Sequence, residues 1–293
     1  MTDDVIVVGA GIIGLLAARA LLQRGRQVVL LDAGMARPGA SWAAGGILSP
    51  LFPWRYNEAV SRLTHDAVPR YERLAAELRA TGCTDPEVNH CGMLVLPLLG
   101  VDETQHAKQW GAEFGIDIQL PTVRDHLQGT TNDQPAWWLP QLGAVRNPRL
   151  LRSVRESLAQ RGVVAEVARA SRLEPIMDGW RVTTPQGTRT AKQVLVAAGA
   201  WSAELLAPLG VTLPVRPVKG QMALYRLPAW RRPSVVLSPQ GYLVPRRDGL
   251  VLLGSTLETQ TDTMLPDASG AAALADKWQA MLQLLGEAQN VAQ

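Results

Sequence analysis

The chain has 293 residues, 47% of them hydrophobic, and its 29 Lys and Arg residues stand against 26 Asp and Glu residues. A chain of this length can hold one large domain or two, and its apolar content is ample for a buried core. Because the charges nearly balance and no basic run with interleaved aromatic residues occurs, the composition argues against nucleic-acid binding.

Residues 5–34, VIVVGAGIIGLLAARALLQRGRQVVLLDAG, form an apolar stretch near the start of the chain. Its uncharged part before Arg19 has about 15 residues, fewer than the roughly 20 that span a membrane. Asp3 and Asp4 stand where a signal peptide would carry positive charge. Neither a membrane span nor a signal peptide is predicted here, and we expect a cytoplasmic protein.

The same stretch predicts a strand, a helix and a second strand. Residues 5–8 are a β-branched run bounded by Gly9, which suits a buried parallel strand. Residues 12–23 are rich in Leu and Ala and suit a helix, and residues 28–31 form a second apolar strand closed by Asp32. We therefore expect a βαβ unit of about 30 residues.

Three glycines in this unit, Gly9, Gly11 and Gly14, spell GxGxxG between strand and helix. The first allows a tight turn, the second lets the backbone approach a pyrophosphate, and the third lets the helix pack on the strand. Asp32 then stands where an acidic side chain accepts hydrogen bonds from ribose hydroxyls. The pattern predicts dinucleotide binding; the alternative is a βαβ core unit whose glycines serve packing alone.

The next segment, GASWAAGGILSPLFPW at 39–54, is dense in small residues. Small side chains allow the backbone to lie close to a flat or extended ligand. A surface loop is the alternative, but the apolar residues Trp42, Ile47, Leu48 and Phe52 argue against it. We therefore expect this segment beside the cofactor.

Further elements follow along the chain. Residues 57–82 predict a helix interrupted at Pro69 and stopped by Gly82, and residues 147–162 predict a helix with an Asn cap, Pro in its first turn and a closing Gly. Residues 181–193 indicate two strands joined by a turn at 185–187, and residues 193–202, QVLVAAGAWS, a strand that ends in small residues under the cofactor. Other strands are expected at 92–98, 221–227 and 250–256.

Cysteine and histidine patterns give no metal site. Cys83 and Cys91 lie eight residues apart without CxxC spacing, and the four histidines form no HExxH pair. A structural disulfide is possible in principle, but two free thiols in a reducing cytosol are expected.

Together these segments resemble the FAD-dependent amine and amino-acid oxidases of the D-amino-acid oxidase type, and within them the glycine oxidases of thiamine biosynthesis. The closer likeness lies in GGILSPLFPWRYNEAVSRL (45–63), PVKGQM (217–222) and GYLVPRRDGLVLLGST (241–256). The resemblance implies an α/β, Rossmann-like and doubly wound FAD-binding domain, interleaved with an α+β substrate domain on a large, mostly antiparallel sheet. It assigns 1–78 and 141–213 to the FAD-binding domain, 79–140 and 214–265 to the substrate domain, and 266–293 to a final helix.

The resemblance also implies the site residues. Tyr242 would meet the substrate carboxylate, although an ordinary strand tyrosine is the alternative. Asp32 and Ala33 would lie at the adenosine ribose, and Ala170 would contact adenine through its backbone. The remaining cofactor-binding residues that the resemblance implies are Gly9, Gly11, Ile12, Ile13, Gly14, Ala40, Ser41, Gly45, Gly46, Ile47, Ala198, Gly199 and Trp201.

The implied reaction oxidises the C–N bond of a small amino acid or amine, such as glycine, sarcosine or a D-amino acid. Hydride passes to N5 of FAD, the imine is hydrolysed, and oxygen regenerates the flavin and forms hydrogen peroxide. The FAD is expected to be non-covalent, since no Cys or His lies in the segments near the flavin ring. The alternatives are a D-amino-acid dehydrogenase that passes electrons to a quinone and a flavin-binding protein without turnover; a homo-oligomer is left open.

One departure from the family concerns the C-terminus. In relatives the final helix leads to a strand with a Trp-x-Gly-x-Arg-Pro signature, whose arginine pairs with the substrate carboxylate, and then to a glycine-rich segment. The sequence ends in LLGEAQNVAQ without these features. We therefore expect a chain that is C-terminally incomplete.

Overall fold

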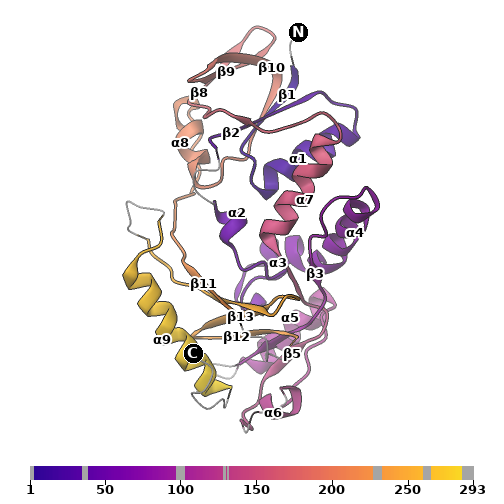
Figure 1. Cartoon of the computed structure of the whole chain (residues 1–293), viewed down its shortest axis with the longest axis vertical. Helices are drawn as coiled ribbons and strands as arrows, with labels where there is room; N and C mark the ends of the chain where they lie inside the picture. The colour runs from indigo at the N-terminus through magenta and orange to yellow at the C-terminus, as the bar shows by residue number, and fades with distance from the viewer. Residues whose placement is uncertain are drawn as a thin grey trace.

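The computed structural model describes residues 3–34, 39–96, 103–127, 130, 132–226, 233–259 and 265–285. Its strands form two six-stranded sheets and one sheet of two strands. Figure 1 shows the two large sheets at opposite ends of an elongated molecule, with helix α2 (Ala40–Ala43) between them.

The first sheet contains the predicted βαβ unit. Its strand order is β7-β2-β1-β10-β9-β8, with β7, β2, β1 and β10 parallel and the last two pairs antiparallel. Helix α1 (Ile12–Gln23) joins β1 to β2, which confirms the predicted strands and helix. The other bounds are β1 (Asp3–Val8), β2 (Val28–Asp32), β7 (Glu166–Val167), β8 (Arg172–Ile176), β9 (Gly179–Thr184) and β10 (Gly187–Val196).

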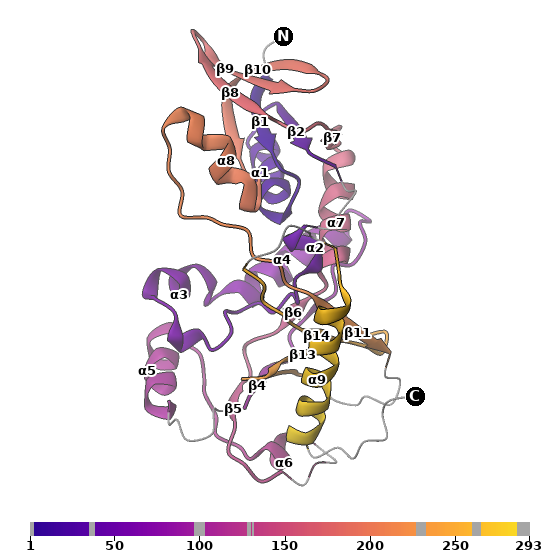
Figure 2. The ribbon, with the colours of Figure 1, turned by 90° about the vertical axis from the view of Figure 1, so that its left-hand side faces the viewer.

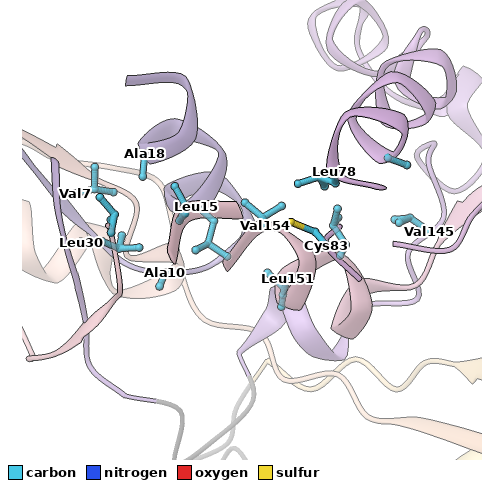
Figure 3. Close-up of a cluster of buried hydrophobic side chains, with 14 of the residues drawn as sticks. Val7, Ala10, Leu15, Ala18, Leu30, Leu78, Cys83, Val145, Leu151 and Val154 are labelled. Carbon is cyan, nitrogen blue, oxygen red and sulfur yellow. The ribbon is translucent and has the colours of Figure 1, made fainter. Parts of the chain in front are cut away.

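One hydrophobic core joins this sheet to two further helices, α4 (Ala67–Ala80) and α7 (Asn147–Ala159). In Figure 3, Val7 and Leu30 from the strands face Leu15 from α1, and Leu151 and Val154 from α7 continue the cluster toward Leu78 and Cys83. The apolar face of α7 therefore packs in the same core as α1, which lies on the first sheet.

The second sheet has the order β11-β14-β13-β12-β4-β5, and every pair is antiparallel except β12 with β4. Helix α9 (Ala268–Leu284) lies along it (Figure 2). Trp278 of α9 stacks on Tyr225 of β11 with 4.4 Å between ring centroids. The strands are β4 (Met93–Val95), β5 (Trp137–Leu139), β11 (Met222–Arg226), β12 (Val235–Ser238), β13 (Gly241–Pro245) and β14 (Leu250–Gly254).

The first sheet, whose βαβ unit is parallel, and the mostly antiparallel second sheet together confirm the predicted fold class. The strands expected within 92–98, 221–227 and 250–256 are present, while residues 97–98 and 227 of those predictions, and 286–293 of the last segment, lie outside the described residues. The proposed domain boundaries stay a prediction. The remaining elements are η1 (Pro53–Arg55), α3 (Glu58–Thr64), β3 (Val88–Asn89), α5 (Thr104–Phe114), α6 (Val123–His126), β6 (Ala144–Val145), η2 (Gly199–Trp201), α8 (Ser202–Leu206) and η3 (Ala207–Leu209).

Three local expectations were wrong. Residues 187–196 form one strand, β10, where the end of one strand and the start of another were expected, and residues 199–202 are helical. The helix break comes at residues 65–66, before Pro69, which sits in the first turn of α4 where a helix needs no proline N–H. Helix α7 begins at Asn147 with Arg146 as its N-cap, and no side-chain hydrogen bond caps it. Asn147 faces Gly46 instead: a Cβ at Gly46 would lie 2.7 Å from its Oδ1.

Cys83 and Cys91 are free thiols, the first buried and the second half-buried. Among the described residues, no helix is both long enough and apolar enough to cross a membrane. Within the same ranges, no group of three or more His, Cys, Asp or Glu side chains is arranged to hold a metal ion.

Candidate cofactor and substrate site

The glycine loop closes tightly against the end of β10. Gly9 has a φ of +107°, and a Cβ there would lie 2.3 Å from the carbonyl oxygen of Ala197. A Cβ at Gly14 would lie 1.8 Å from the carbonyl oxygen of Gly9. Both positions therefore require glycine, because a side chain at either would collide with backbone that cannot move aside.

Helix α1 presents its N-terminus at this loop. Gly11 is the N-cap without a side-chain hydrogen bond, and the Ile12 N–H donates to Ser41 Oγ at 3.1 Å. Ser41 lies on α2 next to Ala40, so the second predicted segment does meet the glycine loop. The other first-turn N–H groups have no partner within the helix and, with the helix dipole, suit a pyrophosphate.

Asp32 ends β2 and binds the loops on both sides of it. Its Oδ2 accepts the Ala10 N–H at 2.7 Å, and its Oδ1 accepts the Gly34 N–H at 3.0 Å, one residue beyond Ala33. Val167 of β7 lies opposite Asp32 in the strand ladder and is 71% exposed. Ala170 packs instead against the core beneath this sheet.

Val167 was not among the predicted site residues, and β7 itself was not predicted because it has only two residues and its pairing with β2 is set by the tertiary fold.

The stretch Gly45-Gly46-Ile47 runs antiparallel to residues 143–145. The Val145 N–H donates to the Gly46 carbonyl at 2.8 Å, Ile47 bridges Ala144, and a Cβ at Gly46 would lie 2.0 Å from the Val145 carbonyl oxygen. This ladder carries the segment from the glycine loop toward the second sheet.

Three apolar side chains near the glycine loop are open to solvent. Ile13 is 68%, Trp201 45% and Trp42 43% exposed. Ile13 is in the first turn of α1, Trp42 adjoins Ser41, and Trp201 closes η2, which starts at Gly199 after Ala198. Exposed apolar groups around a glycine loop suit a ligand with an extended aromatic part.

Tyr242 on β13 faces this stretch from the second sheet. A Cβ at Gly45 would lie 2.7 Å from its Cε2, so the ring lies against the Gly45 backbone. The side chain is 7% exposed, and its hydroxyl is 3.9 Å from Met222 Sδ. Burial raises the pKa of this phenol, which keeps the hydroxyl a donor at neutral pH.

Arg246 follows β13 directly and was not among the predicted site residues. Its Nη2 donates to the Gly45 carbonyl at 2.8 Å and its Nη1 to the Val145 carbonyl at 3.1 Å. The residue is 9% exposed, and burial lowers its pKa to about 10, so the guanidinium stays charged at neutral pH. A sequence carries no sign that this arginine, rather than Arg247, points inward.

These features fit a dinucleotide with a flat ring. Gly9 and Gly14 in the loop leave no room for a side chain, and helix α1 presents its N-terminus there. The Asp32 carboxylate at the end of β2 lies next to the exposed strand β7. On the other side, the Gly45 backbone lies against the ring of Tyr242, and Gly46 pairs with Val145.

Comparisons with known proteins agree with this geometry. The family model described as FAD dependent oxidoreductase (DAO) matches residues 4–292. Glycine oxidase from Pseudomonas aeruginosa is 42% identical over 265 residues, covering 88% of this chain and 72% of that protein, and glycine oxidase from Pseudomonas putida is 39% identical with coverage of 88% and 72%.

The crystal structure of glycine oxidase from Geobacillus kaustophilus superposes with a TM-score of 0.88 at 26% identity, over 97% of this chain and 78% of that one. The match of the family model to nearly the whole chain, the sequence identity and the shared fold point the same way. The chain belongs to the DAO family of FAD-dependent oxidoreductases, and FAD is its cofactor.

Proposed function

We propose that this enzyme is an oxidase of a small amino acid or amine of the glycine, sarcosine or D-amino-acid type, which uses oxygen and forms hydrogen peroxide. The observation that carries the proposal is the contact of the Tyr242 ring with the Gly45 backbone. This contact joins the second sheet to the glycine-rich segment 39–54. The similar proteins named glycine oxidase support it.

The residues at the first sheet would hold FAD without a covalent bond. The α1 N-terminus and Ser41 would face the pyrophosphate, and Asp32 and Ala33 the adenosine ribose. Val167 is proposed as a further adenine neighbour, because it lies opposite Asp32, while the backbone contact of Ala170 with adenine stays a prediction. The cofactor, when bound, supplies the hydride acceptor.

On the substrate side, Tyr242 would donate its hydroxyl hydrogen to the substrate carboxylate. The raised pKa of the phenol favours the protonated form that this bond needs. The apolar surroundings of the ring, which include Met222 and Val244, exclude water and strengthen such a bond. An anchored carboxylate fixes the carbon that loses hydride, which lowers the barrier through orientation.

The test is a substrate screen on purified protein. Acid precipitation should release a yellow supernatant that mass spectrometry identifies as FAD. Small amino acids should bleach the flavin absorbance without oxygen and form peroxide in its presence. Bleaching without peroxide would favour a quinone-linked dehydrogenase, and no bleaching by any amino acid or secondary amine would reject the proposal. A cytoplasmic location stays a prediction.

A further inference from the structure

The turn between β13 and β14 lies next to the short antiparallel ladder formed by residues 45–47 and 143–145. Residues 246–249 form this turn, with the Gly249 N–H donating to the Arg246 carbonyl at 3.2 Å. Arg246 reaches two carbonyls of the ladder, and Arg247 donates from Nη2 to the Val88 carbonyl at 2.8 Å. The hairpin is thus bound to main-chain atoms from residues far apart in sequence.

A buried guanidinium is costly unless its donors are satisfied and its charge is balanced. Arg246 donates to carbonyl oxygens, and the carboxylates that balance its charge, Glu87 and Asp248, act on it from a distance. Glu87 itself bonds Arg146 Nη1 at 3.1 Å and accepts the Arg247 N–H at 3.0 Å. These charged groups therefore surround the β13–β14 hairpin, and Arg246 is the one whose guanidinium contacts Gly45.

Arg246 and Tyr242 lie four residues apart along the β13 direction, so their side chains emerge on the same face. Both contact Gly45: the ring lies against its backbone, and the guanidinium binds its carbonyl. Two successive glycines have more accessible backbone conformations than other residues. The hydrogen bond from Arg246 to the Gly45 carbonyl therefore restricts the backbone rotation of this pair.

We infer that Arg246 is a positioning residue whose guanidinium fixes the Gly45–Gly46 backbone against Tyr242, and that FAD affinity and substrate binding depend on this clamp. The inference deepens the proposed function, since it rests on Gly45 and Gly46 facing the flavin. No proton transfer or group transfer is assigned to Arg246.

The experiment compares Arg246→Lys and Arg246→Ala with Arg247→Ala in the full chain. Arg247 is a matched control, because it lies in the same turn, binds a carbonyl and pairs with Asp85 at 3.0 Å, but does not contact Gly45. The loss of a hydrogen bond from a charged donor should raise the FAD dissociation constant about tenfold in Arg246→Lys and more in Arg246→Ala. Arg247→Ala should lower the melting temperature with little effect on FAD affinity.

Two further readouts separate positioning from general destabilisation. Millimolar guanidinium ion should restore FAD affinity to Arg246→Ala but leave Arg247→Ala unchanged, since only the first variant leaves a guanidinium-sized gap at Gly45. The Leu48 and Val145 amides donate to the Gly143 and Gly46 carbonyls and so form the ladder. In the apoprotein, hydrogen exchange at these two amides should be faster in the Arg246 variants than in the wild type, and unchanged in Arg247→Ala. If Arg246→Ala does not fold, Arg246→Lys carries the measurements of FAD affinity and of hydrogen exchange.

Equal effects of the Arg246 and Arg247 substitutions on FAD affinity and on exchange would overturn the inference. Wild-type protein that binds FAD but is bleached by no amine would instead reject the proposed function. The exchange measurement needs no flavin, so it tests the clamp even in that case.

Discussion

The two large sheets encode their parts of the site in different ways. In the first, the hydrogen bond that ties the glycine loop to its carboxylate is local, because Ala10 and Asp32 are only 22 residues apart. In the second, Arg246 bonds Gly45 across 201 residues of sequence. A short loop can be recognised in the sequence as a motif, whereas a contact between segments far apart in the sequence forms only when both sheets have folded.

The sheets also differ in what holds them at the site. The cofactor loop uses backbone N–H groups, one carboxylate and glycines that no other residue can replace. The second sheet reaches the site through side chains, an aromatic ring and a guanidinium. Substitutions in the first sheet should therefore act mainly on FAD. In the second sheet, a change at Tyr242 should act mainly on substrate, whereas a change at Arg246 should also act on FAD through the Gly45 backbone.

The largest effect is expected at Gly14. In Gly14→Ala the added Cβ would lie 1.8 Å from the Gly9 carbonyl oxygen, and because backbone lies on both sides the loop must open. Forced overpacking of this kind should cost about 3 kcal/mol or more, and FAD binding should be lost. Melting temperature and FAD content of the purified protein measure both effects.

Gly25→Asn is the control in the same βαβ unit. Gly25 lies beyond the C-terminal end of α1 with a φ of +74°, which Asn tolerates, and among the described atoms none lies within 4 Å of an added Cβ. This variant should keep its FAD and its stability. Normal FAD content in Gly14→Ala would show that the loop is less tightly closed than the structure has it.

The βαβ unit of the first sheet could be predicted from the sequence nearly to the residue, since a β-branched run, a glycine pattern and an Asp mark it. Strands β7 and β8 of the same sheet were not predicted. The second sheet could be predicted only as separate strands. Its order depends on pairings such as Val235 with Met93, which join segments with no shared motif. For the same reason Tyr242 was found through family resemblance, and Arg246 was found only in the structure.

The second prediction tests the substrate side through Tyr242→Phe. A hydroxyl that donates to a carboxylate contributes roughly 1.5–3 kcal/mol, so its loss should raise KM for an amino-acid substrate about ten- to a hundredfold. FAD affinity should change little, because the ring still covers Gly45. Steady-state kinetics with an amino acid and with an amine that lacks a carboxylate give the comparison.

Tyr225→Phe is the control for this variant, since Tyr225 lies in the same sheet but stacks on Trp278 of α9. It should leave both KM values unchanged. Equal effects of Tyr242→Phe on the two substrates would make Tyr242 a packing residue, which its 7% exposure also permits.

A third prediction returns to the cofactor sheet. Asp32→Ala removes the acceptor of the Ala10 and Gly34 N–H groups and the proposed partner of the ribose hydroxyls. FAD affinity, measured by flavin fluorescence, should fall about tenfold or more, because charge-assisted bonds are lost. KM at saturating FAD should stay near the wild-type value. An unchanged FAD affinity would contradict the role assigned to Asp32.

The smallest expected effect concerns the charges that fasten α9 to the second sheet. Asp267 is the N-cap of α9: its side chain accepts the Gly270 N–H at 2.8 Å, and it forms an ion pair with the largely buried Lys219. Lys219, followed by the Gly270 N–H, lowers the pKa of Asp267. A carboxyl whose pKa is lower in the folded state adds stability above its unfolded pKa of about 4 and loses it as pH falls further.

Asp267→Asn keeps a good N-cap side chain but removes the charge. Its melting temperature should lie a few degrees below that of the wild type at pH 6, and the gap should narrow as pH falls below about 4, where the wild-type carboxyl begins to lose its advantage. Asp133→Asn, which removes an exposed partner of Arg124, should follow the wild-type curve throughout. A gap between wild type and Asp267→Asn that stays constant from pH 6 to pH 3 would show that the ion pair with Lys219 adds no charge-dependent stability, and that packing of Trp278 and its neighbours alone holds α9 on the sheet.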